Sequence, residues 1–157
     1  MSIRVSKDDF DVGLEIEQLG RSGAGIGAIV SFVGLVRDMA GEAPLRAMEL
    51  EHYPGMTERE LRGIETEANR RWPLAQSLIV HRYGRLLPGD RIVLVATASA
   101  HRSVAFEACE FLIDWLKTRA PFWKREETAT GDHWVEARAS DNRAAARWDG
   151  EVAPASE

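Results

Sequence analysis

The 157-residue sequence predicts a single α+β domain in which two main helices pack on a mostly antiparallel sheet. Short apolar runs bounded by glycine and proline predict strands, and two longer stretches with apolar residues at helical spacing predict helices. Their order along the chain is ββαββαββ. The length suits one continuous core, so we expect residues 1–150 to form the domain and residues 151–157 to be a disordered tail.

The N-terminal part of the chain is predicted to contain one short helix and the first strand. An acidic helix is expected within Ser6 to Leu19. The glycine-rich stretch Gly20 to Ile29 leads into a strand, Ala28 to Arg37, whose nearly continuous apolar character predicts burial on both faces. These glycines precede a strand instead of linking a strand to a helix, and no Gly-Lys-Ser/Thr follows. They are therefore a weak nucleotide-binding motif.

A second strand and the first main helix follow. Leu45 to Tyr53 predicts the strand. Thr57 with Glu60 has the spacing of a capping box, in which two side chains satisfy free backbone N–H groups, so a helix is expected to begin there. It is expected to run to about Trp72, because Pro73 cannot continue it.

A hairpin is predicted next. Its strands are Gln76 to Tyr83 and Arg91 to Thr97, joined across Leu87-Pro88-Gly89-Asp90. Proline followed by glycine fits a type II turn, because glycine adopts the positive φ that the third turn position requires.

The second main helix begins near Ser103 and has the strongest pattern in the chain. Apolar residues cover two of its sides, with Val104, Ala108, Phe111, Leu112 and Trp115 on one and Phe106, Cys109 and Ile113 on the other. The remaining polar stripe is narrow, so the helix is predicted to be largely buried. Cys109 is interpreted as a core residue and not as a catalytic thiol.

Two lysines lie seven residues apart at the end of this helix. Pro121 separates Lys117, on the helix, from Lys124, on a new segment. The two amines are therefore free to approach one pocket from two directions, although the pattern alone does not show that they meet. Short strands around Phe122 to Glu127 and His133 to Ala137 complete the predicted fold.

Composition excludes several classes of protein. The net charge of -5 argues against a nonspecific nucleic-acid or membrane-surface binder, since such proteins carry an excess of basic residues. A single cysteine permits no disulfide within the chain, and no apolar run approaches the roughly 20 residues that span a bilayer. A cytoplasmic location is expected. From Ala144 onward apolar periodicity is lost, and the chain is expected to fray.

Basic residues gather at the ends of four predicted elements: Arg37, then His101 and Arg102, then Lys117 and Arg119, then Lys124 and Arg125. Taken singly, each is more often structural than functional. Their grouping in an acidic protein also suits a site for an anionic small molecule that uses an amine for proton transfer or as a nucleophile. Both interpretations stay open on pattern alone. The four histidines lack the spacing of a zinc site, so no metal is expected.

Five segments together resemble the family of the large, catalytic subunit of molybdopterin synthase, the MoaE family. The resemblance extends from Gly27 to about Trp148, and it is specific because the lysine pair, the AHR triplet and the HYPGM turn occur in the family's order and spacing. The segments are GAIVSFVGLVRD, MELEHYPGMTERE, VHRYGRLLPGD, ASAHRSVAFEACEFLIDWLKTRAPFWKRE and GDHWVEAR.

The resemblance implies an α/β hammerhead fold and a sulfurtransferase. Two sulfurs would be placed on cyclic pyranopterin monophosphate, opening its cyclic phosphate and forming the dithiolene of molybdopterin. The sulfur would come from a thiocarboxylate on the C-terminal Gly-Gly tail of a small ubiquitin-like partner subunit. Two copies of the large subunit would form the homodimer core of a heterotetramer, and neither a metal nor an organic cofactor is implied.

The resemblance also assigns residues to this chemistry. Lys117 would perform acid/base work and Lys124 would stabilise charge as the second essential amine. Substrate-binding positions implied by the match are Leu35, Val36, Arg37, His101, Arg102, Lys117, Lys124, Arg125, Glu126 and Arg138. Arg138 could act in its own subunit or in the neighbouring one.

Two other functions remain as alternatives. A non-catalytic scaffold of the same fold could dock a ubiquitin-like tail, and it would be expected to have lost one of the lysines. A binding module for a phosphorylated metabolite would tolerate replacement of Lys117 with ligand binding largely intact and would need no partner.

Overall fold

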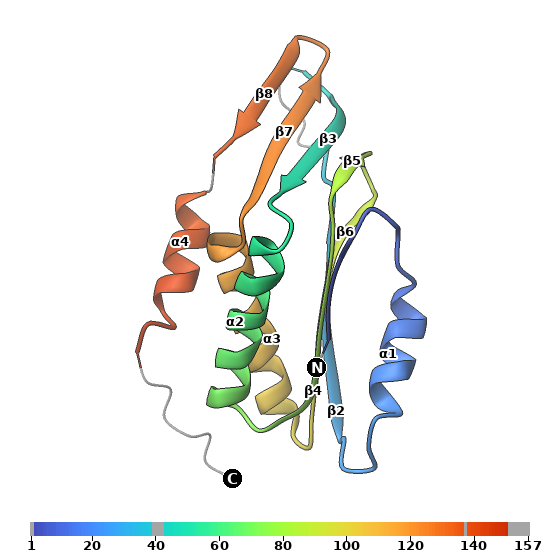
Figure 1. Ribbon diagram of the computed structural model, residues 1–157, viewed down its shortest axis with the longest axis vertical. Helices are drawn as coiled ribbons and strands as arrows, with labels where there is room; N and C mark the ends of the chain where they lie inside the picture. The colour runs from blue at the N-terminus through green and yellow to red at the C-terminus, as the bar shows by residue number, and fades with distance from the viewer. Residues whose placement is uncertain (1, 39–42, 137, 151–157) are drawn as a thin grey trace.

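The computed structural model describes residues 2–38, 43–136 and 138–150, and it has the predicted α+β class. The ββαββαββ series is present as β2 to β8, but β1, α1, β5 and α4 add to it (Figure 1). In chain order the elements are β1 (Ser2–Ser6), α1 (Val12–Gly20), β2 (Ala28–Leu35), β3 (Leu45–His52), α2 (Met56–Arg71), β4 (Leu74–Arg82), β5 (Gly84–Leu86), β6 (Arg91–Ser99), α3 (Arg102–Arg119), β7 (Phe122–Thr128), β8 (Gly131–Val135) and α4 (Ala139–Ala146).

The strands form two sheets, where the sequence pattern predicted one. The first sheet has the strand order β1-β4-β6-β2 and the second has the order β5-β3-β7-β8. Only the β1–β4 pair is parallel among the described pairings, so the mostly antiparallel character is confirmed. In Figure 1 the second sheet stands at one end of the molecule, beyond the first sheet and its helices. None of the helices in the described ranges combines the length and apolar character needed to cross a bilayer.

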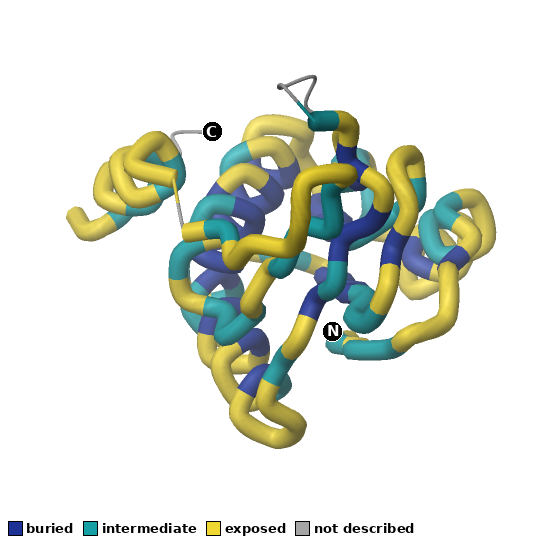
Figure 2. The backbone as a smooth tube through the Cα atoms, turned by 90° about the horizontal axis from the view of Figure 1, so that it is seen from above, coloured by how far each residue is buried: buried dark blue, intermediate teal, exposed yellow. Residues whose placement is uncertain are grey.

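Helices cover both faces of the first sheet, which explains its apolar central strands. Ile79, Val93 and Val95 point to the side of α2 and α3. The alternate residues Leu78 and Leu94 point to the side of α1, because successive side chains of a strand face opposite ways. Figure 2 shows that the buried segments concentrate between the first sheet and these helices, whereas α4 lies at the periphery.

β2 is not buried on both faces, contrary to the prediction. It pairs with β6 alone and forms one edge of the first sheet. Phe32 is 36% exposed and Leu35 is 54% exposed. An apolar run indicates a strand, but it does not state how many neighbours the strand has, and this is why the prediction failed.

The N-terminal segment begins with a strand that the sequence reading missed. Ser2–Ser6 pairs in parallel with β4, and the helix begins only at Val12. Asp11 accepts a hydrogen bond from the Leu14 N–H and so caps α1. The alternating pattern of Ile3 and Val5, whose side chains pack against the core, was the available sequence signal.

The first main helix has its N-cap two residues before the predicted one. Gly55 occupies the N-cap position with φ of 83°, a conformation that glycine adopts without strain, and its N–H donates to Glu58. The capping pair is therefore Gly55 with Glu58, and the predicted Thr57–Glu60 pair is wrong. Thr57 is buried, and its hydroxyl donates to the Tyr53 carbonyl. The predicted end is confirmed, since α2 stops at Arg71.

The predicted turn between the hairpin strands is present, with an addition. Gly89 has φ of 91°, and the Asp90 N–H donates to the Leu87 carbonyl across the turn. Before this turn the chain forms β5, which pairs with β3. The connection therefore leaves the first sheet, contributes the edge strand of the second, and returns.

The second main helix is buried as predicted, except at one position. Phe111 is fully buried and Cys109 lies in the core, where burial raises the thiol pKa to about 11. Phe106, predicted to lie on an apolar side, is 61% exposed. The helix ends at Arg119 and β7 starts at Phe122, so Pro121 separates the two elements as predicted.

Between Ala144 and Gly150 the chain is ordered, contrary to the predicted fraying. Residues Ala139–Ala146 form α4, and Ala145 and Trp148 pack against the core. The Trp148 indole N–H donates to Asp114 of α3 at 2.8 Å. The predicted tail, residues 151–157, and the predicted strand end at Ala137 lie outside the described residues.

Candidate functional site

Lys117 and Lys124 lie where the end of α3 meets the start of the second sheet. Lys117 is in the last turn of α3, and Lys124 is in β7 after the break at Pro121. Partial desolvation of the Lys124 amine lowers its pKa, and the positive charge of Lys117 lowers it further. The two amines therefore act on each other electrostatically, which is the juxtaposition that their spacing left open.

The start of α4 brings two more charged residues to this place. Asp141 Oδ1 lies 3.9 Å from Lys117 Nζ. Asp141 raises the pKa of Lys124 and Arg138 lowers it, so both are close enough to act on that amine. We call Lys117, Lys124, Arg138 and Asp141 the lysine site. Arg138 was predicted from the sequence, whereas Asp141 was not.

Aromatic stacking holds the strand that carries Lys124. The Phe122 ring stacks on the buried His81 ring, with centroids 3.7 Å apart and planes at 15°. His81 lies in β4 of the first sheet, and its Nδ1–H donates to the Arg82 carbonyl at 2.8 Å. Phe122 therefore ties the first residue of β7 to the first sheet, two residues before the amine. This contact fixes the junction between the sheets.

His81 is expected to make stability depend on pH. Burial is the largest cause that lowers its pKa from 6.5 to about 4, so the folded protein keeps this imidazole neutral. As pH falls below 6.5, the His81 imidazole takes up a proton in the unfolded chain but stays neutral in the folded chain. The free energy of unfolding should therefore fall between about pH 6.5 and pH 4, by about 3 kcal/mol from this group.

The measurement is denaturant unfolding at several pH values across this window, with His81→Gln as the control. Glutamine retains a donor for the Arg82 carbonyl but does not titrate. The difference between the two proteins isolates His81 from the carboxylates. Parallel curves for both would contradict the assignment of a neutral buried imidazole.

The predicted residues after Lys124 divide between two faces of the second sheet. Because side chains alternate along a strand, Glu126 shares a face with Lys124 and Arg125 points the other way. Glu126 Oε2 is 3.2 Å from His133 Nε2 of β8. The Arg125 guanidinium lies 6.0 Å from the centre of the Trp134 ring. Arg125 is thus outside the lysine site, whereas Glu126 adds a negative charge near Lys124.

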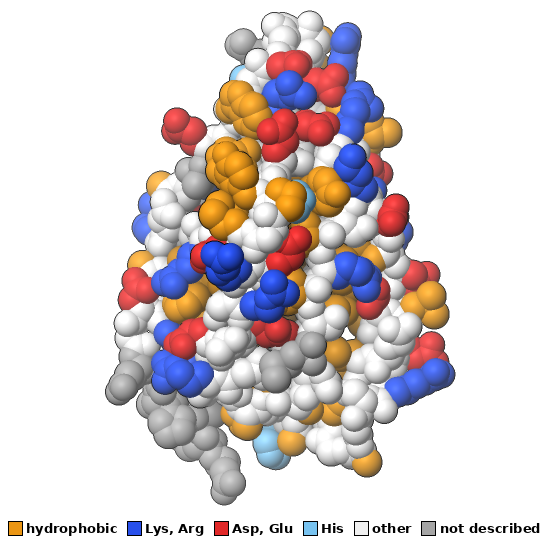
Figure 3. All heavy atoms as spheres, viewed as in Figure 1, with side chains coloured by type: hydrophobic (Ala, Val, Ile, Leu, Met, Phe, Trp, Pro, Cys, Tyr) orange, Lys and Arg blue, Asp and Glu red, His pale blue; other side chains and the backbone are white. Residues whose placement is uncertain are grey.

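Exposed aromatic side chains accompany the second sheet. Tyr53 and Trp123 meet edge to face with centroids 4.5 Å apart, and each is more than one-third exposed. Figure 3 shows hydrophobic side chains gathered over the region of β3 and β7. Trp123 directly precedes Lys124 on β7, so by the same alternation its ring lies on the face of the second sheet opposite to the Lys124 side chain.

His101 and Arg102 are not brought to the lysine site within one chain. They lie at the N-terminus of α3, with His101 as its N-cap residue, and Lys117 lies at the opposite end. At 1.5 Å per residue, 15 residues of helix separate Arg102 from Lys117 by about 22 Å. Both His101 and Arg102 are exposed. Two separate basic groups therefore exist on one copy of the chain.

The remaining predicted residues lie at the end of β2. Val36 is buried in a cluster with Leu50 and Leu86, so its side chain packs in the core. Its N–H donates to the Asp90 carbonyl at 2.8 Å, which fixes the backbone at this point. Leu35 and Arg37 on either side are exposed. Arg37 is thus an exposed residue that directly follows a backbone position fixed by a hydrogen bond.

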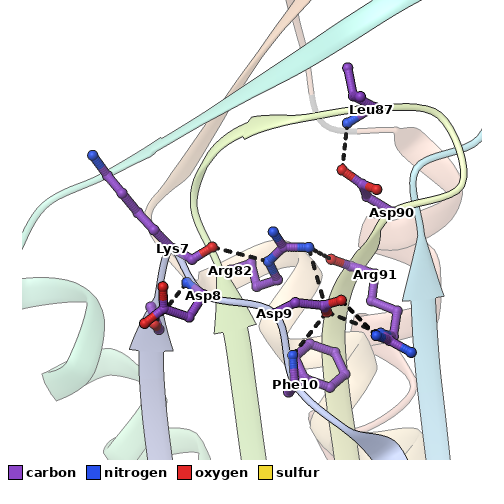
Figure 4. Close-up of polar contacts among 9 residues, drawn as sticks. Lys7, Asp8, Asp9, Phe10, Arg82, Leu87, Asp90 and Arg91 are labelled. Atoms are coloured by element: carbon purple, nitrogen blue, oxygen red, sulfur yellow. Dashed lines mark hydrogen bonds and ion pairs between the residues drawn. The ribbon is translucent and has the colours of Figure 1, made fainter.

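A surface hollow of about 490 Å³ opens beside Leu35, away from the lysine site. Its lining comprises Asp9, Val12, Val33, Leu35, Gly89, Asp90 and Arg91. Figure 4 shows Arg91 and Arg82 converging on the Asp9 carboxylate, and the Arg91 hydrogen bond lowers the Asp9 pKa to about 2. These charges satisfy one another and tie the segment between β1 and α1 to the sheet. Among the described residues, no group of three His, Cys, Asp or Glu is placed to hold a metal.

The small number of lysines in the chain is a signal for the site that the sequence analysis above did not use. The chain has three lysines, Lys7, Lys117 and Lys124, against 17 arginines. Arginine keeps its proton at every physiological pH, whereas a lysine amine can lose its proton when its surroundings disfavour charge. Since arginine supplies nearly all other cations, two lysines at one place indicate a requirement for an amine.

Comparisons with known proteins agree on one family. The family model described as MoaE protein matches residues 5–119. A relative from Pseudomonas aeruginosa, named molybdopterin synthase catalytic subunit, is 56% identical over 149 residues, covering 95% of this chain and 99% of that relative. A relative of the same name from Ralstonia nicotianae is 54% identical over 147 residues, covering 94% and 84%. The solved structure of a molybdopterin biosynthesis MoaE protein from Burkholderia ambifaria MC40-6 superposes with a TM-score of 0.82 at 54% identity, covering 96% of this chain and 99% of that one.

Proposed function

The chain belongs to the MoaE protein family, and from this premise we propose that it is the catalytic subunit of a molybdopterin synthase. In this reaction two sulfurs pass from the C-terminal thiocarboxylate of a small ubiquitin-like subunit to cyclic pyranopterin monophosphate. The product carries the dithiolene of molybdopterin. The observation that carries the proposal is the lysine site, where two amines act on each other beside Asp141 and Arg138.

The two lysines have different roles in the proposed chemistry. Lys117 transfers protons as the thiocarboxylate sulfur attacks the substrate, and it must therefore exchange a proton at Nζ. Lys124 stabilises negative charge that develops in the intermediates. The Lys117 charge lowers the pKa of Lys124, which supports a site in which the two amines act on each other.

Binding of the substrate phosphate is assigned to Arg37, His101 and Arg102. A phosphate suits such donors, and the free N–H groups at the start of α3 add to the attraction. The distance of about 22 Å along α3 is too long for Arg102 and Lys117 of one copy to hold the same small substrate. We therefore infer that each complete site combines Lys117 of one copy with His101 and Arg102 of a second copy. This assembly agrees with the homodimer that the family resemblance implies.

Replacing Arg102 with alanine is expected to raise KM for the pterin about 10- to 100-fold and to change kcat much less. The exposed guanidinium binds the phosphate, which does not react directly with sulfur, so its loss removes binding common to ground state and transition state. Steady-state kinetics with excess thiocarboxylated partner measure both constants. A drop in kcat with unchanged KM would contradict this role.

A mixed dimer tests whether the site is shared. One chain carries Arg102→Ala and the other carries Lys117→Ala, each with a different affinity tag. In a shared site, one of the two sites receives both intact residues, so activity returns to about half of the wild-type value per dimer. If each copy holds a complete site, the mixed dimer shows no activity beyond the residual rate of the Arg102→Ala sites.

The direct test of function is a single-turnover assay with purified protein, cyclic pyranopterin monophosphate and a thiocarboxylated small subunit. Dithiolene product is expected from the wild type. Absence of product from a protein that still binds the small subunit would favour the scaffold alternative. Binding of the pterin that needs no partner and survives Lys117→Ala, without product, would favour the metabolite-binding module.

A further inference from the structure

The short helix α4 is held firmly at its far end and meets the lysine site with its first turn. It has eight residues and buries none of them, and an isolated helix of this length is unstable in water. Its position must therefore come from contacts of its C-terminal end. As a result, the residues at its N-terminal end lie at the lysine site.

Those anchoring contacts are polar and aromatic together. Arg147 pairs with Asp114 at 2.7 Å and with Glu110 at 2.6 Å, both on the polar stripe of α3. The Trp148 carbonyl accepts from Arg71 of α2 at 2.6 Å. The Trp148 ring meets Phe111 edge to face, with centroids 5.7 Å apart. These contacts join α4 to both main helices and leave little freedom for its opposite end.

At that opposite end, Asp141 acts on cations from two other elements. It contacts Lys117 at the end of α3 and raises the pKa of Lys124 in β7. Arg138, the N-cap residue of α4, acts on the Lys124 amine as well and lowers its pKa. Glu126 of β7 is the second carboxylate near Lys124. His81 of β4 also lies within electrostatic reach of Lys124, and its burial keeps it neutral. Asp141 is the carboxylate that contacts Lys117.

We propose that Asp141 is a positioning residue for the lysine site: its carboxylate, placed by α4, holds the Lys117 amine toward Lys124 and balances the surrounding positive charge. This inference rests on the proposed function for its catalytic meaning. Without Asp141, Lys117, whose side chain is 47% exposed, would turn away from Lys124 into solvent. The carboxylate therefore lowers the cost of keeping two like charges together.

A purely structural role gives a different expectation. An acidic residue in the first turn of a helix interacts favourably with the helix dipole, and Asp141 occupies that turn. Its loss would then lower stability slightly and reduce activity only in proportion to unfolded protein. Asp149 provides a matched control, because it lies just after the same helix and pairs with Arg119 at 3.7 Å, away from the lysine site.

The experiment compares Asp141→Asn, Asp141→Glu and Asp149→Asn with the wild type in the single-turnover assay. We expect Asp141→Asn to lower the rate of product formation 10- to 100-fold, with KM for the pterin, measured separately by steady-state kinetics, changed less than threefold. Asp141→Glu restores the carboxylate and should recover most of the rate. Asp149→Asn should keep the wild-type rate. Equal rates for Asp141→Asn and wild type, in folded proteins, would overturn the inference.

A second readout needs no activity. Reductive methylation with ¹³C-formaldehyde labels the three lysines and the N-terminal amine, and their NMR signals can be titrated and assigned with Lys7→Arg and Lys124→Arg. Asp141→Asn removes a group that raises the Lys124 pKa, but in the proposal it also releases Lys117, whose larger effect lowers that pKa. The Lys124 titration should therefore move to higher pH, and the Lys117 signal should shift. A move of the Lys124 titration to lower pH would mean that Lys117 stays in place and would contradict its positioning by Asp141. Asp149→Asn should leave both signals unchanged. Unchanged signals in Asp141→Asn would refute the inference, whether or not the wild type forms product. A wild type that forms no product would by itself refute only the proposed function.

Discussion

Replacing Lys117 with alanine is expected to reduce the single-turnover rate about 10²- to 10⁴-fold, the contribution typical of a positioned acid or base. The free energy of unfolding should change by less than about 1 kcal/mol. Lys117 is half-exposed at the end of α3, and its ion pair with Asp141 spans 3.9 Å at the surface, where such pairs contribute little to stability. Loss of turnover in Lys117→Ala would therefore be caused by loss of the catalytic amine and not by unfolding of the variant.

A further variant, with a matched control, distinguishes proton transfer by the Lys117 amine from the effect of its positive charge. Lys117→Arg keeps a cation that can pair with Asp141, but a guanidinium does not release its proton, so this variant should remain inactive. Lys7→Arg makes the same substitution at a lysine that lies over the Tyr83 ring and is not part of the lysine site, and it should retain full activity. Wild-type rates in Lys117→Arg would exclude proton transfer by this residue, and unfolding of Lys117→Ala would leave the catalytic assignment without support.

Replacing Phe111 with alanine is expected to lower the free energy of unfolding by about 3–5 kcal/mol. Phe111 is fully buried on α3. Its ring contacts Trp72 just after α2, Trp115 of its own helix and Trp148 after α4. Removal of the ring leaves a cavity at the point where three segments meet, so the anchoring of α4 should weaken with the core.

Phe106→Ala is the matched control, since it deletes the same ring from an exposed position of the same helix. It should change stability by less than about 0.5 kcal/mol. Urea denaturation gives both values, and an unchanged m-value would show that the denatured state is the same. Similar losses from the two variants would mean that the burial described for α3 is wrong.

The predictability of the fold differs between local and long-range features. The limits of α3 and the break at Pro121 follow from helical spacing and proline chemistry within a few residues, and both were predicted. The place of β2 at a sheet edge depends on pairing with a strand about 60 residues away along the chain, which its own apolar run does not encode. The helix α4 was missed because its stability comes from Arg147 and Trp148 contacts and not from its own pattern.

The candidate site shows the same division. Family motifs identified Lys117, Lys124 and Arg138, and their electrostatic coupling required the structure. The separation of Arg102 from Lys117 could have been calculated from helix geometry alone once both were placed on α3. Asp141 had no sequence signal beyond its place three residues after Arg138. Only the fold of α4 against α3 brings it to the amine.

The open edge at β2 has a consequence for colloidal behaviour. An unpaired strand edge can accept a strand from another molecule, and Phe32 and Leu35 add exposed apolar surface there. A bulge between Gly34 and Leu35 interrupts the regular ladder near one end, and the net charge of -5 makes copies repel one another. Added salt screens that repulsion without covering the edge. Solubility of the isolated chain should therefore fall with added salt at pH 7, where the chain carries its negative charge, and fall as pH approaches the isoelectric point of about 5.5, where that charge is lost. It should be highest when a bound copy or partner covers β2.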